Sequence, residues 1–216
     1  METVINILIL ETEPSDTVAV LDELHRPDLK IGTLEIKRPA DVLPKLEMNP
    51  PGAILACTRE PDHALFELLE HLRESSRTLP VIVITARCEP GQLVELMECG
   101  AAAHVRRQNL GELADVIRYT LENPLPSPSM PEIEVVRELD PVESRSRAAR
   151  GTCEPPVVRC ICEGCSRIAD ASGEWERFNV FLRRNQKTII TLGLCPECAR
   201  DRADFSEPAR PWLQPH

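Results

Sequence analysis

Val81-Ile82-Val83-Ile84-Thr85 is an uninterrupted run of β-branched residues that follows Pro80. Two further runs, residues 4–10 and 53–57, are also apolar or nearly so. Runs of this length without polar alternation are typical of strands whose two faces are both covered by helices. We therefore predict three buried strands, and residues 31–36 and 102–105 are weaker strand candidates.

Amphipathic stretches separate these runs. Leu65, Leu68, Leu69 and Leu72, for example, recur at the spacing of one helix face. Five strands that alternate with five helices predict an α/β fold, a doubly wound five-stranded parallel sheet. The expected helices cover residues 15–25, 40–48, 64–75, 92–99 and 110–121.

Length and composition divide the chain into four parts. Its 216 residues suffice for one ordinary domain and a small module. Residues 124–157 contain seven prolines and many charged side chains, so we expect an extended linker there, with at most a short helix near residues 133–139. The predicted domains are therefore residues 1–123 and 158–205, and residues 206–216 form a C-terminal tail.

The net charge of −10 is unevenly distributed. It is −9 for residues 1–123, −2 for residues 124–157 and +1 for residues 158–216. No segment has the strongly basic balance that binding to phosphates requires, which argues against a nucleic-acid partner.

The chain begins METVINILIL, an apolar run without a basic flank, which indicates a buried strand rather than a signal peptide. No apolar stretch is long enough to span a bilayer. Nine cysteines without an export signal indicate a reducing compartment, where thiols are free or metal-bound. We therefore expect a cytoplasmic protein with no membrane partner.

Two cysteine pairs near the C-terminus predict a metal site. They are Cys162-Glu-Gly-Cys165 and Cys195-Pro-Glu-Cys198, and 29 residues separate them. Two such turns can bring four thiolates to one tetrahedral zinc ion. The alternatives are disulfides, a redox dithiol or an iron site. Four cysteines would saturate the ion and leave no position for water, so we expect structural zinc. Cys160 is expected to be a spare thiol, and whether it or Cys153 joins the site stays open.

Residues 3–122 resemble the receiver domain of two-component response regulators, of the flavodoxin-like type. The stretches that carry the resemblance are ILILETEPSD, AILACTREPDHALFELLEHLR, LPVIVITA and CGAAAHVRRQNLGEL. In that family an acidic pair after the first strand binds magnesium, and an aspartate that ends the third strand accepts a phosphoryl group. Glu11 and Thr12 match the acidic pair, with Glu13 beside them, and Cys57 matches the aspartate. The family also has a Thr or Ser after the fourth strand, an aromatic switch residue in the fifth strand and a lysine after it. The matching residues here are Thr85, His104 and Arg107.

These departures indicate that the site has lost its phosphoryl chemistry. A sulfur atom is a poor ligand for the hard magnesium ion, so we expect neither Mg²⁺ binding nor phosphorylation. Arg107 could pair with Glu11 or Glu13 and hold one conformation. Cys57 has two interpretations: a small buried hydrophobe, or an oxidant-sensing thiol whose pKa is lowered by Arg59 or Arg107.

The C-terminal part resembles a module that follows receiver or sensory domains in bacterial signalling proteins. The resemblance covers residues 158–203 and rests on Ile168, Asp170, Gly173, Trp175 and the four paired cysteines, among others. We expect strands at residues 157–161 and 188–194. Between them, a helix over residues 174–185 should bury Trp175, Phe178, Phe181 and Leu182. So small a module should need its metal to fold.

The leading hypothesis is a non-catalytic signalling adaptor, a pseudo-receiver that meets a protein partner or a second copy. In receivers this contact commonly uses the fourth helix, fifth strand and fifth helix. The alternatives are a thiol or iron redox sensor and a transcriptional regulator that binds DNA through the zinc module. The five histidines are scattered and no phosphate-binding loop is present, so we expect no enzymatic activity and no small-molecule substrate. The contact face would include Leu93, Met97, His104, Val105 and residues 108–121.

Overall fold

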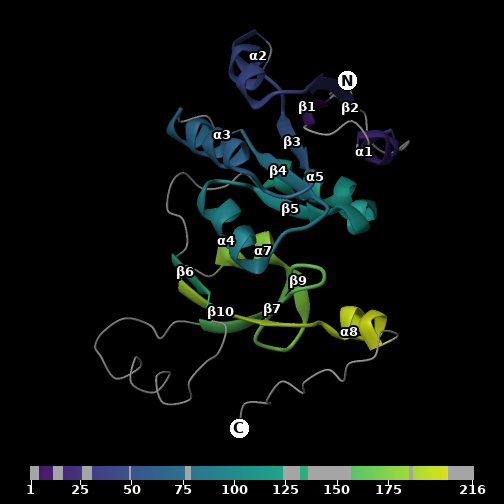
Figure 1. The fold of residues 1–216 in the computed structure, drawn as a ribbon, viewed down its shortest axis with the longest axis vertical. Helices are drawn as coiled ribbons and strands as arrows, with labels where there is room; N and C mark the ends of the chain where they lie inside the picture. The colour runs from purple at the N-terminus through teal and green to yellow at the C-terminus, as the bar shows by residue number, and fades with distance from the viewer. Residues whose placement is uncertain are drawn as a thin grey trace. The chain divides into compact units, whose positions relative to one another are not determined.

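The computed structural model describes residues 5–11, 17–25, 31–48, 50–75, 79–123, 132–135, 157–184 and 187–203. The chain divides into two compact units, residues 1–130 and 131–216 (Figure 1). Each unit contains one five-stranded sheet. None of the described helices has the length and apolar character needed to cross a membrane.

The first unit is a doubly wound sheet whose strands run in the order β2-β1-β3-β4-β5 and are all parallel. This confirms the predicted α/β fold. Its elements in chain order are β1 (Ile5–Glu11), α1 (Thr17–Leu24), β2 (Ile31–Ile36), η1 (Pro39–Asp41), α2 (Val42–Met48), β3 (Ala53–Thr58), α3 (His63–Glu74), β4 (Val81–Thr85), α4 (Pro90–Glu98), β5 (Ala103–Arg106), η2 (Arg107–Glu112) and α5 (Leu113–Glu122).

The apolar runs of the sequence form the centre of this sheet. Every residue of β3 and β4 is buried, because helices cover both faces of these strands. On one face, α1 and α5 lie side by side and close a core (Figure 1). Its members from the strands and helices are Ile7, Ile9, Leu55, Cys57, Ile82, Ile84, Val20, Leu24, Leu113, Val116 and Ile117.

The second unit contains a mixed sheet in the order β6-β10-β7-β8-β9. Strands β6 and β7 both pair with β10 in parallel, whereas β8 and β9 form antiparallel pairs. Helix α8 follows the last strand of the chain. The elements are β6 (Glu132–Val135), β7 (Val157–Cys162), β8 (Arg167–Ala169), β9 (Trp175–Arg177), α7 (Phe178–Arg184), β10 (Lys187–Gly193) and α8 (Pro196–Ala203).

Two local predictions for the second unit are wrong. Within the expected linker of residues 124–157, Glu132–Val135 forms strand β6 instead of part of a helix, since Glu-Ile-Glu-Val alternates with the period of a strand. The expected helix over residues 174–185 is divided. Trp175–Arg177 pairs with β8 as strand β9, and only Phe178–Arg184 is helical. Phe178, Phe181 and Leu182 are buried as expected, but Trp175 belongs to the sheet.

Other expected segments lie outside the described residues. They include most of the predicted linker and the tail of residues 206–216. Thr12, Glu13 and Cys153 also fall outside them.

Candidate metal centre and receiver pocket

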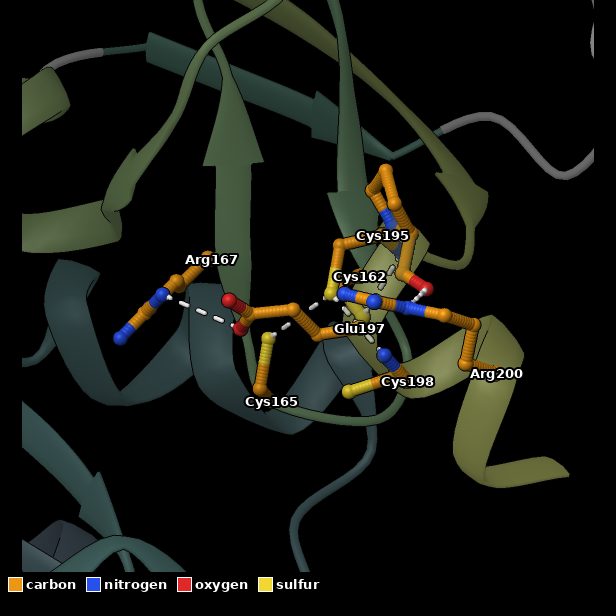
Figure 2. A network of polar contacts seen from close by, with 8 residues as sticks. Cys162, Cys165, Arg167, Cys195, Glu197, Cys198 and Arg200 are labelled. Atoms are coloured by element: carbon orange, nitrogen blue, oxygen red, sulfur yellow. Dashed lines mark hydrogen bonds and ion pairs between the residues drawn. The ribbon is translucent and has the colours of Figure 1, made fainter.

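The four paired cysteines converge at one point. The first knuckle is the turn between β7 and β8, and the second lies between β10 and α8. Because β7 and β10 are adjacent and parallel, with Cys162 opposite Gly193, their carboxyl ends place the two knuckles together. The Sγ atoms of Cys162, Cys165, Cys195 and Cys198 all lie within 4.8 Å of one another (Figure 2).

This cluster fits a tetrahedral metal ion. A zinc–sulfur distance of about 2.3 Å places two sulfur ligands about 3.8 Å apart, and the Sγ atoms of Cys165 and Cys195 are 3.7 Å apart. Four thiolates and no carboxylate or imidazole form the ligand set, which suits a closed structural site. Cys162 and Cys195 are buried, whereas Cys165 and Cys198 are half-buried.

Backbone amides support the sulfur atoms. The N–H of Cys195 donates to Sγ of Cys162 at 3.2 Å, and the N–H of Cys198 donates to Sγ of Cys195 at 3.4 Å. A hydrogen bond from the Cys165 thiol, together with backbone N–H groups, lowers the pKa of Cys162 to about 4. Loss of hydration raises the pKa of Cys198 to about 12. Metal binding would therefore displace protons, and metal affinity should fall as pH falls.

The first knuckle requires glycine at position 164. A Cβ atom there would lie 2.7 Å from Sγ and 2.8 Å from Cβ of Cys198, because the two knuckles pack directly against each other. The same turn ends at Ser166, which has a φ of 62° and donates its N–H to the carbonyl of Cys162 at 2.8 Å. This left-handed conformation completes the turn around the metal position.

Sequence reasoning missed a charged contact between the knuckles. Nη1 of Arg167, just after the first knuckle, lies 3.6 Å from Oε2 of Glu197 in the second knuckle (Figure 2). Cys160, the expected spare thiol, lies on β7 outside the cluster and occupies the space beside Gly193, where a Cβ would approach its Sγ to 2.6 Å. No local sequence pattern indicates the contact between Arg167 and Glu197, because the two residues come from different knuckles.

The second candidate site lies at the carboxyl ends of β1, β3 and β4. Glu11 and Cys57 are register partners on neighbouring strands, and Thr58 and Thr85 are partners on the next pair. Glu11, Cys57 and Thr85 are all buried, with exposed fractions of 6%, 2% and 0%. The structure therefore brings these predicted residues to one edge of the sheet.

Thr85 forms a hydrogen bond with His104. Oγ1 of Thr85 lies 2.9 Å from Nε2 of His104 on the adjacent strand β5. Loss of hydration, with a smaller contribution from the positive charge of Arg106, lowers the pKa of His104 to about 3. The imidazole is therefore neutral at physiological pH, and one hydrogen bond joins two uncharged groups.

One carboxylate oxygen of Glu11 is buried without a hydrogen bond to the described residues. This oxygen is Oε1, and its state does not test a pairing of Arg107 with the other carboxylate oxygen, so the Arg107–Glu11 pair stays a prediction. Arg107 begins the 3₁₀ helix η2 directly after β5. Glu13, the other proposed partner of Arg107, lies outside the described residues, so that pairing stays a prediction.

Hydrogen bonds join the loops around this edge. The carbonyl of Arg59, after β3, accepts from the N–H groups of Ala86 and Arg87, after β4, at 3.1 and 2.9 Å. Nη2 of Arg106 donates to the carbonyl of Cys88 at 2.8 Å. Burial raises the pKa of the Cys88 thiol to about 12, so this thiol is protonated and unreactive at neutral pH.

Solved structures of response regulators resemble the first unit. The RcsB response regulator of Salmonella typhimurium has a TM-score of 0.50 and 14% identity, and the match covers 59% of this chain and 64% of that one. A DNA-binding response regulator of the LuxR family from Staphylococcus aureus has a TM-score of 0.46 and 21% identity over 55% of this chain and 99% of that one. A receiver domain of a histidine kinase from Syntrophus aciditrophicus has a TM-score of 0.47 and 23% identity, with coverages of 55% and 90%.

These identities establish the fold alone. The strand order 2-1-3-4-5 of parallel strands is the flavodoxin-like order, and the RcsB match agrees with it. The first unit has the receiver fold. No protein-family model and no curated protein matches the chain, and the matched region spans less than two thirds of the RcsB chain.

Within this receiver fold, Cys57 stands at the carboxyl end of the third strand, where the resemblance places the phosphoacceptor aspartate. Its thiol belongs to the core that α1 and α5 cover. His104, Thr85 and Glu11 also lie where the resemblance places them, at the carboxyl ends of their strands or within β5. Among the described residues, this edge of the sheet carries the Glu11 carboxylate, the Cys57 thiol and the hydroxyls of Thr58 and Thr85, and the expectation that magnesium does not bind here stays a prediction.

Proposed function

We propose that this chain is a non-catalytic adaptor of two-component-type signalling. Its receiver acts without phosphorylation, and its C-terminal module is a second protein-binding part that structural zinc holds together. The observation that carries this proposal is the burial of Cys57 opposite Glu11, with exposed fractions of 2% and 6%. A thiol at this position can neither accept a phosphoryl group as an aspartate does nor contribute an oxygen ligand to magnesium.

The Thr85–His104 hydrogen bond supports a receiver that holds one conformation. In receivers the matching threonine and aromatic positions take part in switching, and here they already bond each other at 2.9 Å. The bonds from Ala86 and Arg87 to the carbonyl of Arg59 join the two loops that flank the pocket. A ligand that moved these loops would first have to break those contacts.

The proposed contact surface of the receiver is the face formed by α4, β5 and α5. Strand β5 is the edge strand of the sheet, and His104 is half-buried on it. Leu93 and Met97 of α4 and Val105 of β5, which the sequence placed on the contact face, are buried in the unit. They therefore pack beneath this face and are not available to contact a partner. The exposed Asp115 and Arg118 of α5 form an ion pair at 3.4 Å and would border the contact.

The alternative functions have less support. A redox role for Cys57 conflicts with its 2% exposure, because an oxidant has to reach the sulfur atom. DNA binding through the module conflicts with its near-neutral charge, which a dianionic zinc–tetrathiolate would make negative. A colourless purified protein with one zinc per chain would exclude iron, whose tetrathiolate site is red.

Phosphorylation tests the proposal. The full chain is incubated with acetyl phosphate and Mg²⁺, and its intact mass is measured beside that of a receiver with an aspartate. We expect no mass change in this chain. A stable increase of one phosphate on the receiver unit would refute the adaptor proposal.

Metal analysis tests the second part of the proposal, the structural zinc site. We expect Cys160→Ser to keep the full metal content, because Cys160 lies outside the cluster, and Cys165→Ser to lose the metal and unfold the module. Unchanged zinc stoichiometry in Cys165→Ser would show that the ligand assignment is wrong.

A further inference from the structure

Strand β6 covers only part of one edge of β10. On one side β10 pairs with β7 along residues 188–193, and on the other side it pairs with β6 along residues 187–190 (Figure 1). Among the described residues, Thr191, Leu192 and Gly193 therefore have no neighbouring strand on the β6 side. Extended segments commonly bind proteins by adding a strand to such an edge.

A buried hydroxyl on the covered part of this edge lacks a hydrogen bond. Thr188 is 1% exposed, and its Oγ1 has no partner among the described residues. Its register partners are Ile133 of β6 and Val157 of β7, and both of these residue types are apolar. A buried hydroxyl without a partner costs free energy, which a hydrogen-bonding side chain opposite it would recover. Strand β6 is therefore an incomplete match for the edge that it occupies.

The register defines which segment would fit this edge better. Alternate residues of a strand share one face, and the side chains of register partners lie on the same face of the sheet. Thr188 and Ile190 are buried and Leu192 is half-buried, so the positions opposite them suit one hydroxyl and two aliphatic side chains. The other face begins at the register pair Glu132 and Lys187, whose residue types carry opposite charges. An acidic residue therefore suits the first position.

Strand β6 occupies the edge as a tethered competitor. Only 21 residues, 136–156, connect it to β7, and a connection of this kind keeps a strand at an effective concentration on the order of 1 mM. A partner segment can displace β6 if it pairs with all seven residues of β10 and bonds to Thr188. A second copy of this chain would offer the same Ile133 and would gain nothing at Thr188.

We propose that the edge of β10 binds an extended segment of a partner protein in place of β6. This segment runs parallel to β10, as β6 does, and carries a threonine or serine opposite Thr188 and aliphatic residues opposite Ile190 and Leu192. Strand β6 is the built-in occupant that the partner displaces. This inference rests on the proposed adaptor function, in which the module is a second protein-binding part, and it names the chemistry of the partner.

Peptide binding to the zinc-loaded full chain tests this inference. The probe is fluorescein-Glu-Thr-Glu-Val-Ser-Val-Ser-amide, called the Thr peptide, and its match, the Ile peptide, has isoleucine in place of the threonine. Fluorescence anisotropy measures binding. We expect saturable binding of the Thr peptide below about 1 mM. The Ile peptide should bind about tenfold more weakly, because it leaves the buried hydroxyl without a hydrogen bond.

Variants of the chain separate this contact from general stickiness. Thr188→Val keeps the side-chain shape and should abolish the tenfold preference for the Thr peptide. Thr191→Val is the control on the same strand and should keep the preference, since Oγ1 of Thr191 donates to the carbonyl of Arg159 at 3.2 Å. Val135→Asp, opposite the buried Ile190, should weaken β6 and strengthen binding of the Thr peptide at least about fivefold. Val18→Asp, at a 65% exposed position in the first unit, should not.

Samples with full zinc content are compared, so that a lost fold is not mistaken for lost binding. Absence of Thr-peptide binding to both the parent chain and Val135→Asp would overturn this inference, as would equal peptide preference in the parent and in Thr188→Val. Concentration-dependent dimers that resist the Thr peptide would show that a second copy occupies the edge, and would also overturn it. These results leave the adaptor proposal intact, whereas phosphorylation of the receiver would refute that proposal.

Discussion

Oγ1 of Thr85 and Nε2 of His104 lie 2.9 Å apart, on the two neighbouring strands β4 and β5. Thr85 is fully buried, so this bond is what satisfies its hydroxyl away from water. A contact between two neutral groups thus lies where the resemblance to receiver domains places the switch residues. The predictions for the receiver follow from this contact and from the buried thiol beside it.

The neutral state of His104 predicts acid sensitivity. The folded-state pKa is lowered from 6.5 to about 3, so between these values the unfolded chain binds a proton that the folded chain does not. The free energy of unfolding should therefore fall as pH drops below 6.5, by on the order of 1.4 kcal/mol per pH unit from this residue. Chemical denaturation at several pH values measures it.

His104→Gln should remove this contribution, and the exposed control His63→Gln should keep it, because His63 is 89% exposed. The same acid dependence in the parent chain and in His104→Gln would show that His104 is not buried in its neutral form.

The Thr85 hydroxyl should contribute more to the free energy of unfolding than an average surface hydroxyl does. Thr85→Val keeps the side-chain shape but leaves Nε2 of His104 without its partner, so we expect a loss of about 1–2 kcal/mol in the free energy of unfolding. Thr33→Val on the exposed edge strand β2 is the control and should change it by less than about 0.5 kcal/mol. Equal effects of both substitutions would argue against the Thr85–His104 bond.

Cys57 should resist modification in the folded chain. It is 2% exposed, whereas Cys99 at the end of α4 is half-buried. With iodoacetamide at pH 8, we expect alkylation of Cys57 to be at least about tenfold slower than that of Cys99, and the two rates to become similar in denaturant. Peptide mass spectrometry measures both rates. Preferred labelling of Cys57 in the folded chain would support the redox alternative.

Gly164 should control metal affinity. In Gly164→Ala the new methyl group would meet Sγ of Cys198 at 2.7 Å, so one knuckle must shift and the four sulfur atoms lose their tetrahedral arrangement. Competition with a chelator should show at least about a tenfold weaker affinity for zinc. Gly91→Ala, where no atom lies within 4 Å of the new methyl, should not change it.

Much of the first unit could be predicted from sequence because its strands are uniform apolar runs. Cys57 and Thr85 end two of these runs, and parallel strands end at one edge, so their proximity followed from topology. The Thr85–His104 bond did not, since it depends on the register of β5 and on a particular side-chain rotamer. Strand β6 was missed because a four-residue pattern is weak inside a proline-rich segment.

In the second unit, prediction from the sequence succeeded for the metal ligands and failed for contacts between distant residues. The four cysteines could be assigned from spacing, because metal chemistry fixes their geometry in advance. Trp175 was placed on a helix because its spacing to Phe178 fits a helix face, but the turn at Asp170 and Gly173 pairs it with β8. The contact of Arg167 with Glu197 joins residues from different knuckles, and no local pattern encodes it.

The most direct test of the central claim, a receiver that does not switch, is an NMR titration of the full chain with Mg²⁺ and then beryllofluoride, which mimics a phosphoryl group. We expect the amide signals of Glu11, Cys57, Thr85 and His104 to stay unchanged, because Cys57 offers no carboxylate to either ligand. Saturable shifts at Thr85 and His104 after beryllofluoride would contradict this claim.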